Sequence, residues 1–276
     1  MGVPWLSAGL QCLVRRSLGG PVMTATVIAP EVALQARYDV AVADARSLGK
    51  TELELIAEDA GQRLADARAI DIITWAALTF GERLVVASSM ADGAVAHLAS
   101  RALPGIKVAF LDTGLHFAET IGTRDALAAT LDVEILNATP DLTVEQQAKK
   151  FGPKLWATDP DRCCEMRKVA PLERVLAPFQ AWVTGIRGDE TAARVGTPVV
   201  HWDAKRGMVK INPIARWSNA EVDAYALRYG VLVNPLRQLG FASIGCAPCT
   251  RPVRAGESAR AGRWAGADKN ECGIHV

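Results

Sequence analysis

Short apolar runs alternate with helix-forming segments in the middle of the chain, and this alternation restricts the fold more than any other feature. The runs Leu84–Ser88, Lys107–Leu111 and Val133–Leu136 are separated by helical segments at Ala94–Ala102 and Ala118–Thr130. Short apolar runs are typical of buried parallel strands, and intervening helices supply the crossovers between them. The sequence therefore predicts an α/β fold with a mostly parallel sheet and helices on both faces.

Further elements extend this pattern on both sides. We expect two more strands at Ala181–Ile186 and Met208–Ile214, and capping boxes at Thr51 and Ser218 predict helices that begin there. Residues 51–250 contain no repeat, low-complexity tract or linker, so we assign them to one α/β domain. Residues 1–50 form an N-terminal extension that we expect to be partly disordered. Residues 251–276 are rich in Gly and Arg and predict a mobile tail.

Composition excludes several classes of protein. The formal net charge is +1, so no basic excess points to nucleic acid. No apolar run approaches the roughly 18 residues that a membrane span needs, and we see no secretory signal before residue 23. We therefore expect a cytoplasmic protein without membrane or nucleic-acid partners, whose cysteines are more suited to metal binding or redox chemistry than to structural disulfides.

Polar turns follow two of the predicted strands at one edge of the sheet. Because ligands of such sheets bind at the carboxyl ends of the strands, the turns are candidates for substrate binding. An ordinary helix cap or turn is the alternative explanation for each. The candidate residues are Ser88, Ser89 and Asp92 in the first turn, and Asp112, Thr113 and Gly114 in the second.

Four cysteines occur in two close pairs, Cys163-Cys164 and Cys246-x-x-Cys249. Four thiolates suit an iron–sulfur cluster or a tetrahedral zinc ion, and the adjacent pair is awkward for zinc. A redox disulfide at the second pair is a third interpretation.

Cys272 is left over, and it stands beside Gly273 in the tail. A thiol in such a place is a candidate nucleophile, and His275 lies close to it in sequence. The alternative is a bystander thiol. Six arginines supply forked donors that suit phosphate or sulfate: Arg187, Arg194, Arg251, Arg254, Arg260 and Arg263.

From about Thr51 to its end, the chain resembles the assimilatory sulfonucleotide reductases, which reduce adenosine 5′-phosphosulfate (APS) or its 3′-phosphorylated form (PAPS). The resemblance rests on Leu111-Asp112-Thr113-Gly114, Cys163-Cys164-x-x-Arg167-Lys168-x-x-Pro171-Leu172, Thr184-Gly185-Ile186-Arg187, Ile244-Gly245-Cys246-x-Pro248-Cys249-Thr250, Arg260-x-x-Arg263-Trp264 and Glu271-Cys272-Gly273-x-His275. The two cysteine pairs make it closest to the iron–sulfur, APS-using branch.

This resemblance implies a fold like that of the adenine-nucleotide α-hydrolases, with a modified PP-loop at Ser88–Gly93. It also implies that the two cysteine pairs bind a [4Fe–4S] cluster and that Cys272 is the catalytic nucleophile. For substrate binding, the resemblance implies Lys168, Arg260 and Arg263, with Arg187 as a further contact, and we add His275. Gly188 departs from the family, since many relatives have a basic residue there.

The implied reaction forms a thiosulfonate on Cys272, which a thioredoxin-like partner resolves to release sulfite. Within the family, the alternative is a reductase that uses PAPS or both nucleotides. From other classes, the alternatives are a zinc-containing PP-loop sulfurtransferase that uses ATP, and a non-catalytic nucleotide sensor. The sequence leaves the oligomeric state, including a homo-oligomer, open.

Overall fold

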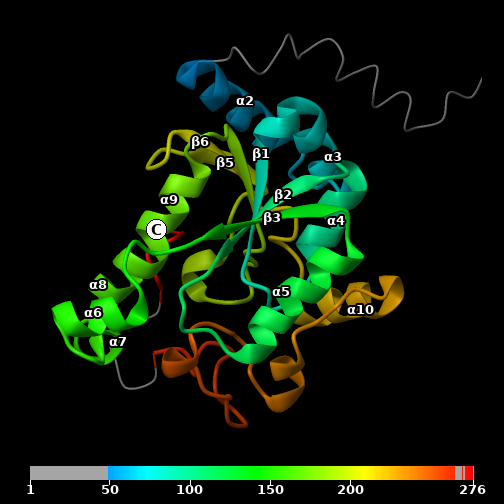
Figure 1. Cartoon of the computed structure of the whole chain (residues 1–276). Helices are drawn as coiled ribbons and strands as arrows, with labels where there is room; N and C mark the ends of the chain where they lie inside the picture. Colours follow the sequence, from blue (N-terminus) through cyan, green and yellow to red (C-terminus); the bar gives the residue numbers. More distant parts are fainter. Residues whose placement is uncertain (1–48, 265–268, 270, 276) are drawn as a thin grey trace, which may run out of the picture. The chain divides into compact units, whose positions relative to one another are not determined.

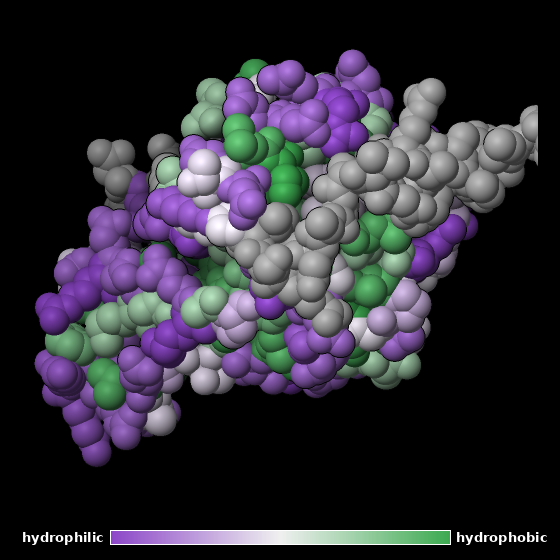
Figure 2. Space-filling model, turned by 90° about the horizontal axis from the view of Figure 1, so that it is seen from above, coloured by the Kyte–Doolittle hydropathy of each residue, from purple (hydrophilic) through white to green (hydrophobic). Residues whose placement is uncertain are grey.

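The computed structural model describes residues 49–264, 269 and 271–275. Most of the predicted N-terminal extension, residues 1–48, lies outside the described residues. None of the helices in the described part of the chain is long and apolar enough to cross a membrane. In the view of Figure 2, hydrophobic residues gather in small separate groups among hydrophilic ones.

A six-stranded sheet forms the centre of the described chain, with the strand order β3-β2-β1-β4-β6-β5 (Figure 1). All neighbouring strands are parallel except β5 and β6, which pair antiparallel. This confirms the predicted mostly parallel sheet. The strands are β1 (Leu84–Ser88), β2 (Ile106–Leu111), β3 (Val133–Ala138), β4 (Ala181–Thr184), β5 (Val200–Asp203) and β6 (Met208–Ile211).

Helices cover both faces of the sheet, as the sequence predicts. Figure 1 shows α9 on one side, and α3, α4 and α5 on the other. The α-helices are α2 (Lys50–Arg63), α3 (Ala69–Phe80), α4 (Ala94–Ala102), α5 (Ala118–Thr130), α6 (Val144–Phe151), α7 (Leu155–Thr158), α8 (Pro160–Cys164), α9 (Ala170–Leu176) and α10 (Asn219–Tyr229). Shorter helical turns are η2 (Gly81–Arg83), the π-helical η3 (Glu165–Val169), η4 (Ala192–Arg194), η5 (Pro235–Leu239) and η6 (Ala247–Cys249).

The two predicted capping boxes have different outcomes. Ser218 caps α10 as expected, because the Glu221 backbone N–H donates to Ser218 Oγ at 3.2 Å and Glu221 Oε2 accepts from the Ser218 N–H at 2.7 Å. The prediction for Thr51 is wrong. Helix α2 instead has Gly49 as its N-cap, since the Gly49 N–H donates to Glu52 Oε2 at 2.7 Å. Glu52 follows Gly49 by three residues, just as Glu54 follows Thr51 by three, and the earlier of these two pairs forms the capping contact that begins the helix.

The face of the sheet under α9 carries a hydrophobic core that reaches the end of the chain. Its fully buried members include Val85 on β1, Trp182 on β4 and Leu172 on α9. Ile274 from the tail belongs to the same core and is 8% exposed. Among the described residues of the tail, Cys272 and Ile274 are therefore packed on this face.

Chain topology creates a natural binding place between β1 and β4. The strand order runs β1-β2-β3 in one direction from β1, and β4 lies on the other side of β1. Loops that leave such a switch point at the carboxyl ends of the strands diverge and leave a crevice. The turns after β1 and β4 border that crevice.

Candidate active site

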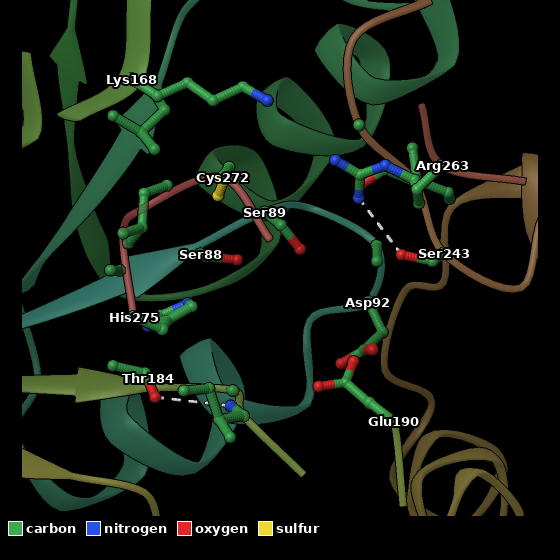
Figure 3. Close-up of a pocket in the computed structure, with 18 of the residues that line it drawn as sticks. Ser88, Ser89, Asp92, Lys168, Thr184, Glu190, Ser243, Arg263, Cys272 and His275 are labelled. Carbon is green, nitrogen blue, oxygen red and sulfur yellow. Dashed lines mark hydrogen bonds between the residues drawn. The ribbon is translucent and has the colours of Figure 1, made fainter. Parts of the chain in front are cut away.

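A pocket occupies this crevice, and several parts of the chain form its wall (Figure 3). They include the turn after β1, the turn after β2, Lys168 on η3, the loop after β4, residues 242–246 and the described residues of the C-terminal tail. Of the residues that the sequence assigns to substrate binding or catalysis, the pocket is lined by Ser88, Ser89, Asp92, Thr113, Lys168, Arg187, Arg260, Arg263, Cys272 and His275. Asp112 and Gly114 do not line it.

The turn after β1 has a constrained backbone. Met90 has a positive φ of 58° although it is not glycine, and its side chain is fully buried. The Met90 N–H donates to Ser88 Oγ at 3.3 Å, and the Ala94 N–H donates to Asp92 Oδ1 at 3.1 Å, so Asp92 accepts the first backbone N–H of α4, whose N-cap is Gly93. A Cβ at Gly93 would lie 2.5 Å from Leu127 Cδ2. Strain of this kind is often found at ligand-binding turns.

The turn after β2 divides its residues between two tasks. Asp112 accepts the Gly114 N–H at 3.1 Å and lies 3.6 Å from Arg124, so it stabilises the turn itself. Thr113 is completely buried, and its hydroxyl lies 3.3 Å from Cys246 Sγ. Its carbonyl accepts from Arg167 Nε at 2.6 Å. Thr113 thus connects the substrate pocket to the cysteine residues.

Lys168, Arg260 and Arg263 bring positive charge into the pocket. In Figure 3 the Lys168 ammonium points into the cavity on the same side as Arg263 and Cys272. Burial alone would lower the pKa of Lys168, but the sulfurs of Cys246, Cys164 and Cys272 raise it above its ordinary value, so the ammonium stays charged. Both arginines and Lys168 lie within 6 Å of the Trp264 ring centre, at 5.8, 4.5 and 5.6 Å.

Arg187 is less available. It is 7% exposed and donates to Asn219 Oδ1 at 2.7 Å, and it also lies 3.4 Å from Asp189 and 3.6 Å from Glu190. These partners already neutralise its charge. Arg187 forms part of the pocket wall.

The tail places Cys272 in the pocket. Cys272 is partly buried and packs against the core under α9, and Ile274 anchors the chain two residues later. His275 is partly buried and stacks on Trp182 with a ring-centre distance of 5.7 Å and an interplanar angle of 11°. Burial holds the pKa of His275 well below its ordinary value, so the imidazole is neutral.

A second, smaller cavity contains the other thiols, and we call it the thiol cavity. Cys163, Cys164, Cys246 and Cys249 all line it, together with Lys168 and Trp264. Burial raises the pKa of Cys163 and Cys164, and it raises the pKa of Cys249 to about 11. Lys168 and Cys246 line both cavities and separate them.

The chemistry of the thiol cavity fits a sulfur-rich group. The Trp264 indole N–H is buried without a hydrogen-bond acceptor among the described residues. A buried donor needs a partner, and a cluster sulfur would supply one. In the same part of the chain, no group of three or more His, Cys, Asp or Glu side chains is arranged to hold a metal ion. The four thiols line one cavity together.

Three residues without an assigned role also line the pocket. Glu190 and Arg194 from the loop after β4, and Glu271 from the tail, form ion pairs with one another. The sequence marks Arg194 only as one of several arginines. The spacing of Glu190 and Arg194, four residues apart, is the signal that could have identified the first pair.

Comparison with known proteins decides the family. Residues 83–252 match the family model described as "Phosphoadenosine phosphosulfate reductase domain", which is more than half of the chain. The chain belongs to this family. Among curated members of this reductase family, an "Adenosine 5'-phosphosulfate reductase" from Streptomyces coelicolor is 60% identical over 224 residues, covering 81% of this chain and 95% of the relative. A protein of the same name from Mycolicibacterium smegmatis is 48% identical, covering 84% of this chain and 99% of the relative.

A solved structure of the reductase family agrees with the fold. The crystal structure of phosphoadenylyl-sulfate (PAPS) reductase from Candida auris has a TM-score of 0.62 and 26% identity to this chain, and the match covers 74% of this chain and 98% of that one. Because the more similar curated relatives are named for APS, the chain lies in the APS branch of the sulfonucleotide reductases.

Proposed function

We propose that this protein reduces adenosine 5′-phosphosulfate to sulfite and AMP, with Cys272 as the nucleophile. One observation carries the proposal: Cys272 lines the same pocket as Lys168, Arg260 and Arg263, at the carboxyl edge of a nucleotide-type sheet. The names of the most similar relatives support the choice of APS. The nucleotide would occupy the part of the pocket between the turn after β1 and the loop after β4.

Charge neutralisation is the main task of the three cations. APS carries negative charge on both its phosphate and its sulfonate, and an anionic thiolate approaches such a group only when that charge is offset. The Lys168 ammonium and the two guanidinium groups provide fixed positive charge in a partly buried site, where it is worth more than in water. Arginine forks also match sulfonate and phosphate oxygens geometrically.

In the first half-reaction, the Cys272 thiolate attacks the sulfur of the sulfonate. A sulfur–sulfur bond forms, and the bond from that sulfur to the bridging oxygen breaks. AMP leaves with the electron pair, and its charge is taken up by the cations. The product on the enzyme is a thiosulfonate at Cys272.

In the second half-reaction, a dithiol reductant of the thioredoxin type attacks the Cys272 sulfur. Sulfite leaves, and a mixed disulfide forms; the second thiol of the reductant then releases Cys272. The dithiol supplies the two electrons that reduce sulfate sulfur to sulfite sulfur. Because Cys272 is partly buried against the core, the tail must move outward before a protein thiol can reach it. Because such a reductant works in a reducing compartment, we expect the reaction to take place in the cytoplasm.

Cys163, Cys164, Cys246 and Cys249 would hold a [4Fe–4S] cluster. Four thiolates suit a cluster with one thiolate on each iron, and the adjacent pair Cys163-Cys164 is awkward for a single tetrahedral zinc ion. When bound, the cluster supplies a fixed charge distribution next to the substrate pocket. Lys168 responds to that charge directly, because it lines both cavities.

The deciding experiment traps the intermediate. The enzyme is purified without oxygen, mixed with APS labelled with ³⁵S in the absence of reductant, and digested. We expect label on the peptide that contains Cys272, released as sulfite by thioredoxin or dithiothreitol. The Cys272→Ser variant should still bind AMP but form no labelled peptide and no sulfite. Turnover by this variant, or label on another cysteine, would contradict the nucleophile assignment.

Parallel kinetics with PAPS test the substrate. A higher kcat/KM for PAPS than for APS would contradict the choice of nucleotide while leaving the chemistry at Cys272 unchanged.

A further inference from the structure

Four charged side chains of alternating sign connect the loop after β4 with the tail. Glu190 pairs with Arg194, Arg194 pairs with Glu271, and Glu271 pairs with Arg260. We call this series the ion clasp. Arg194 contacts Glu271 with two parallel hydrogen bonds, from Nε to Oε1 at 3.0 Å and from Nη2 to Oε2 at 2.9 Å. Arg260 makes a single longer contact with Glu271, at 3.3 Å.

The ion clasp is shielded from water. Its side chains are between 11% and 20% exposed, so the charges attract one another more strongly than pairs on an open surface. Two-point contacts between guanidinium and carboxylate also fix orientation. The pair formed by Arg251 and Glu257 has the same two-point geometry, at 2.8 and 3.0 Å, but it is 36% and 27% exposed and does not line the pocket.

The position of Glu271 is chemically surprising for this site. A carboxylate next to the nucleophile opposes both the thiolate and an anionic substrate. In the observed arrangement Arg194 neutralises it through two contacts, and Arg260 adds one longer contact. A Glu271 carboxylate without these contacts would repel the thiolate and the substrate and so lower activity. With the contacts in place it does not, and we therefore look for a role that Glu271 has only while the ion clasp is formed.

That role is to fix the backbone at Cys272. Glu271 directly precedes Cys272, and Ile274 and His275 anchor the chain after it, in the core and on Trp182. Cys272 is thus held between an ionic contact on one side and an apolar contact on the other. Glycine at 273, with a φ of 81°, allows the sharp turn between these anchors.

We propose that Glu271 is a positioning residue: its carboxylate, held by Arg194 and Arg260, keeps Cys272 in the pocket for attack on the substrate, and it must be released before the reductant can reach Cys272. This inference rests on the proposed function. It predicts opposite effects on the two half-reactions. Loss of the ion clasp slows formation of the thiosulfonate and does not slow, or even accelerates, release of sulfite.

The test uses the Glu271→Gln variant, which keeps the shape of the side chain and removes its charge. Rapid mixing of the anaerobic holoenzyme with APS, without reductant, should show thiosulfonate formation slowed by about 100-fold, the cost expected when a reacting group is misplaced by about 1 Å. Sulfite release by dithiothreitol from enzyme already converted to the thiosulfonate should be as fast as in the parent or faster. Alkylation of Cys272 by iodoacetamide should accelerate.

Glu257→Gln is the matched control, because it breaks a pair of the same geometry in the same segment. Its rates in both half-reactions should equal those of the parent. Glu271→Asp, which keeps the charge with a shorter reach, should recover part of the first rate.

Three results would overturn the inference. They are thiosulfonate formation at the parental rate in Glu271→Gln, slowing of both half-reactions by the same factor, and an unchanged rate of alkylation. Failure of the proposed function is separable from these, because it would appear in the parent enzyme as the absence of any thiosulfonate on Cys272.

Discussion

The two cavities place the same side chain in opposite surroundings. In the thiol cavity, burial raises the pKa of Cys249 to about 11, and the pKa of Cys163 and Cys164 also rises. Cys272 instead lines a pocket with Lys168, Arg260 and Arg263.

Surroundings rather than residue type therefore distinguish Cys272 from the four cysteines of the thiol cavity. Thiols that are protonated when free become ligands only if a metal displaces their protons, and four of them together make that favourable. A single thiol among cations is suited to attack an anionic sulfur centre. The following experiments either break this distinction or define it more closely.

The largest effect is expected when one cysteine of each cavity is replaced by serine. Cys249→Ser should lose nearly all protein-bound iron and the visible absorbance that accompanies it, because one of four ligands is missing. Cys272→Ser should keep the iron of the parent and lose turnover. Iron analysis and a spectrum of both anaerobic variants measure this. Full iron content in Cys249→Ser would mean that the thiol cavity is not the cluster site.

Lys168 lies between the two cavities, and its removal tests whether they communicate. Lys168→Met should lower kcat for APS by about 10²–10³-fold, the usual cost of losing one charge that stabilises a transition state. AMP affinity should change much less. Lys154→Met, which removes an exposed lysine, is the control and should retain parental kcat. Equal activity of both variants would show that Lys168 has no part in the reaction.

A glycine beside the pocket offers a smaller and more local perturbation. A Cβ at Gly245 would lie 2.4 Å from Arg263 Nη2 and 2.5 Å from Arg263 Cζ. Because that guanidinium can move, Gly245→Ala should cost less than about 1 kcal/mol of stability. It should still lower kcat/KM by roughly tenfold, as displaced charges no longer face the substrate.

Gly122→Ala is the control for this change. Gly122 lies on α5, and a methyl group added there would have nothing within 4 Å, so alanine should raise stability by about 0.5–1 kcal/mol and leave turnover unchanged. Parental kcat/KM in Gly245→Ala would argue against a role for Arg263.

The smallest effect on turnover, but a clear one on stability, concerns Lys210 on β6. Burial lowers the pKa of Lys210 to about 8, with Arg206 and Arg194 adding to the decrease against the opposing effect of Asp203. Between pH 8 and 10.5 the unfolded chain therefore holds more protons than the folded one, so this site makes stability rise with pH. Lys210→Met removes the cost of burying the charge.

The variant should be more stable than the parent below pH 8, and its advantage should shrink by about 3 kcal/mol as the pH approaches 10.5. Urea unfolding of both proteins at several pH values measures the difference. An advantage that does not depend on pH would mean that Lys210 is not charged and buried at neutral pH.

The strands that support the site could be predicted because the local pattern of apolar residues determines them. The strand predicted at Leu84–Ser88 is confirmed without change, and those at Ala181–Ile186 and Met208–Ile214 are confirmed with earlier ends, at Thr184 and Ile211. Strand β5 was not predicted. It is an edge strand of four residues, Val200–Asp203, that pairs only with β6, and its sequence lacks a continuous apolar run.

The contents of the site were harder to predict, because they depend on contacts across long stretches of chain. The cysteine pairs stand out in sequence, and the structure brings them into one cavity. By contrast, Glu271 and Arg194 are 77 residues apart, and neither forms a recognisable spacing with the other. Asp112 shows the reverse problem: its motif suggests ligand binding, yet the carboxylate supports its own turn.

The wall shared by the two cavities links the state of the thiol cavity to the pocket. Since Lys168 and Cys246 line both cavities, a change of charge at the four thiols would act one side chain away from that pocket. Under the proposed function, oxidation of those thiols would alter the charge that meets the substrate, without a separate regulatory site.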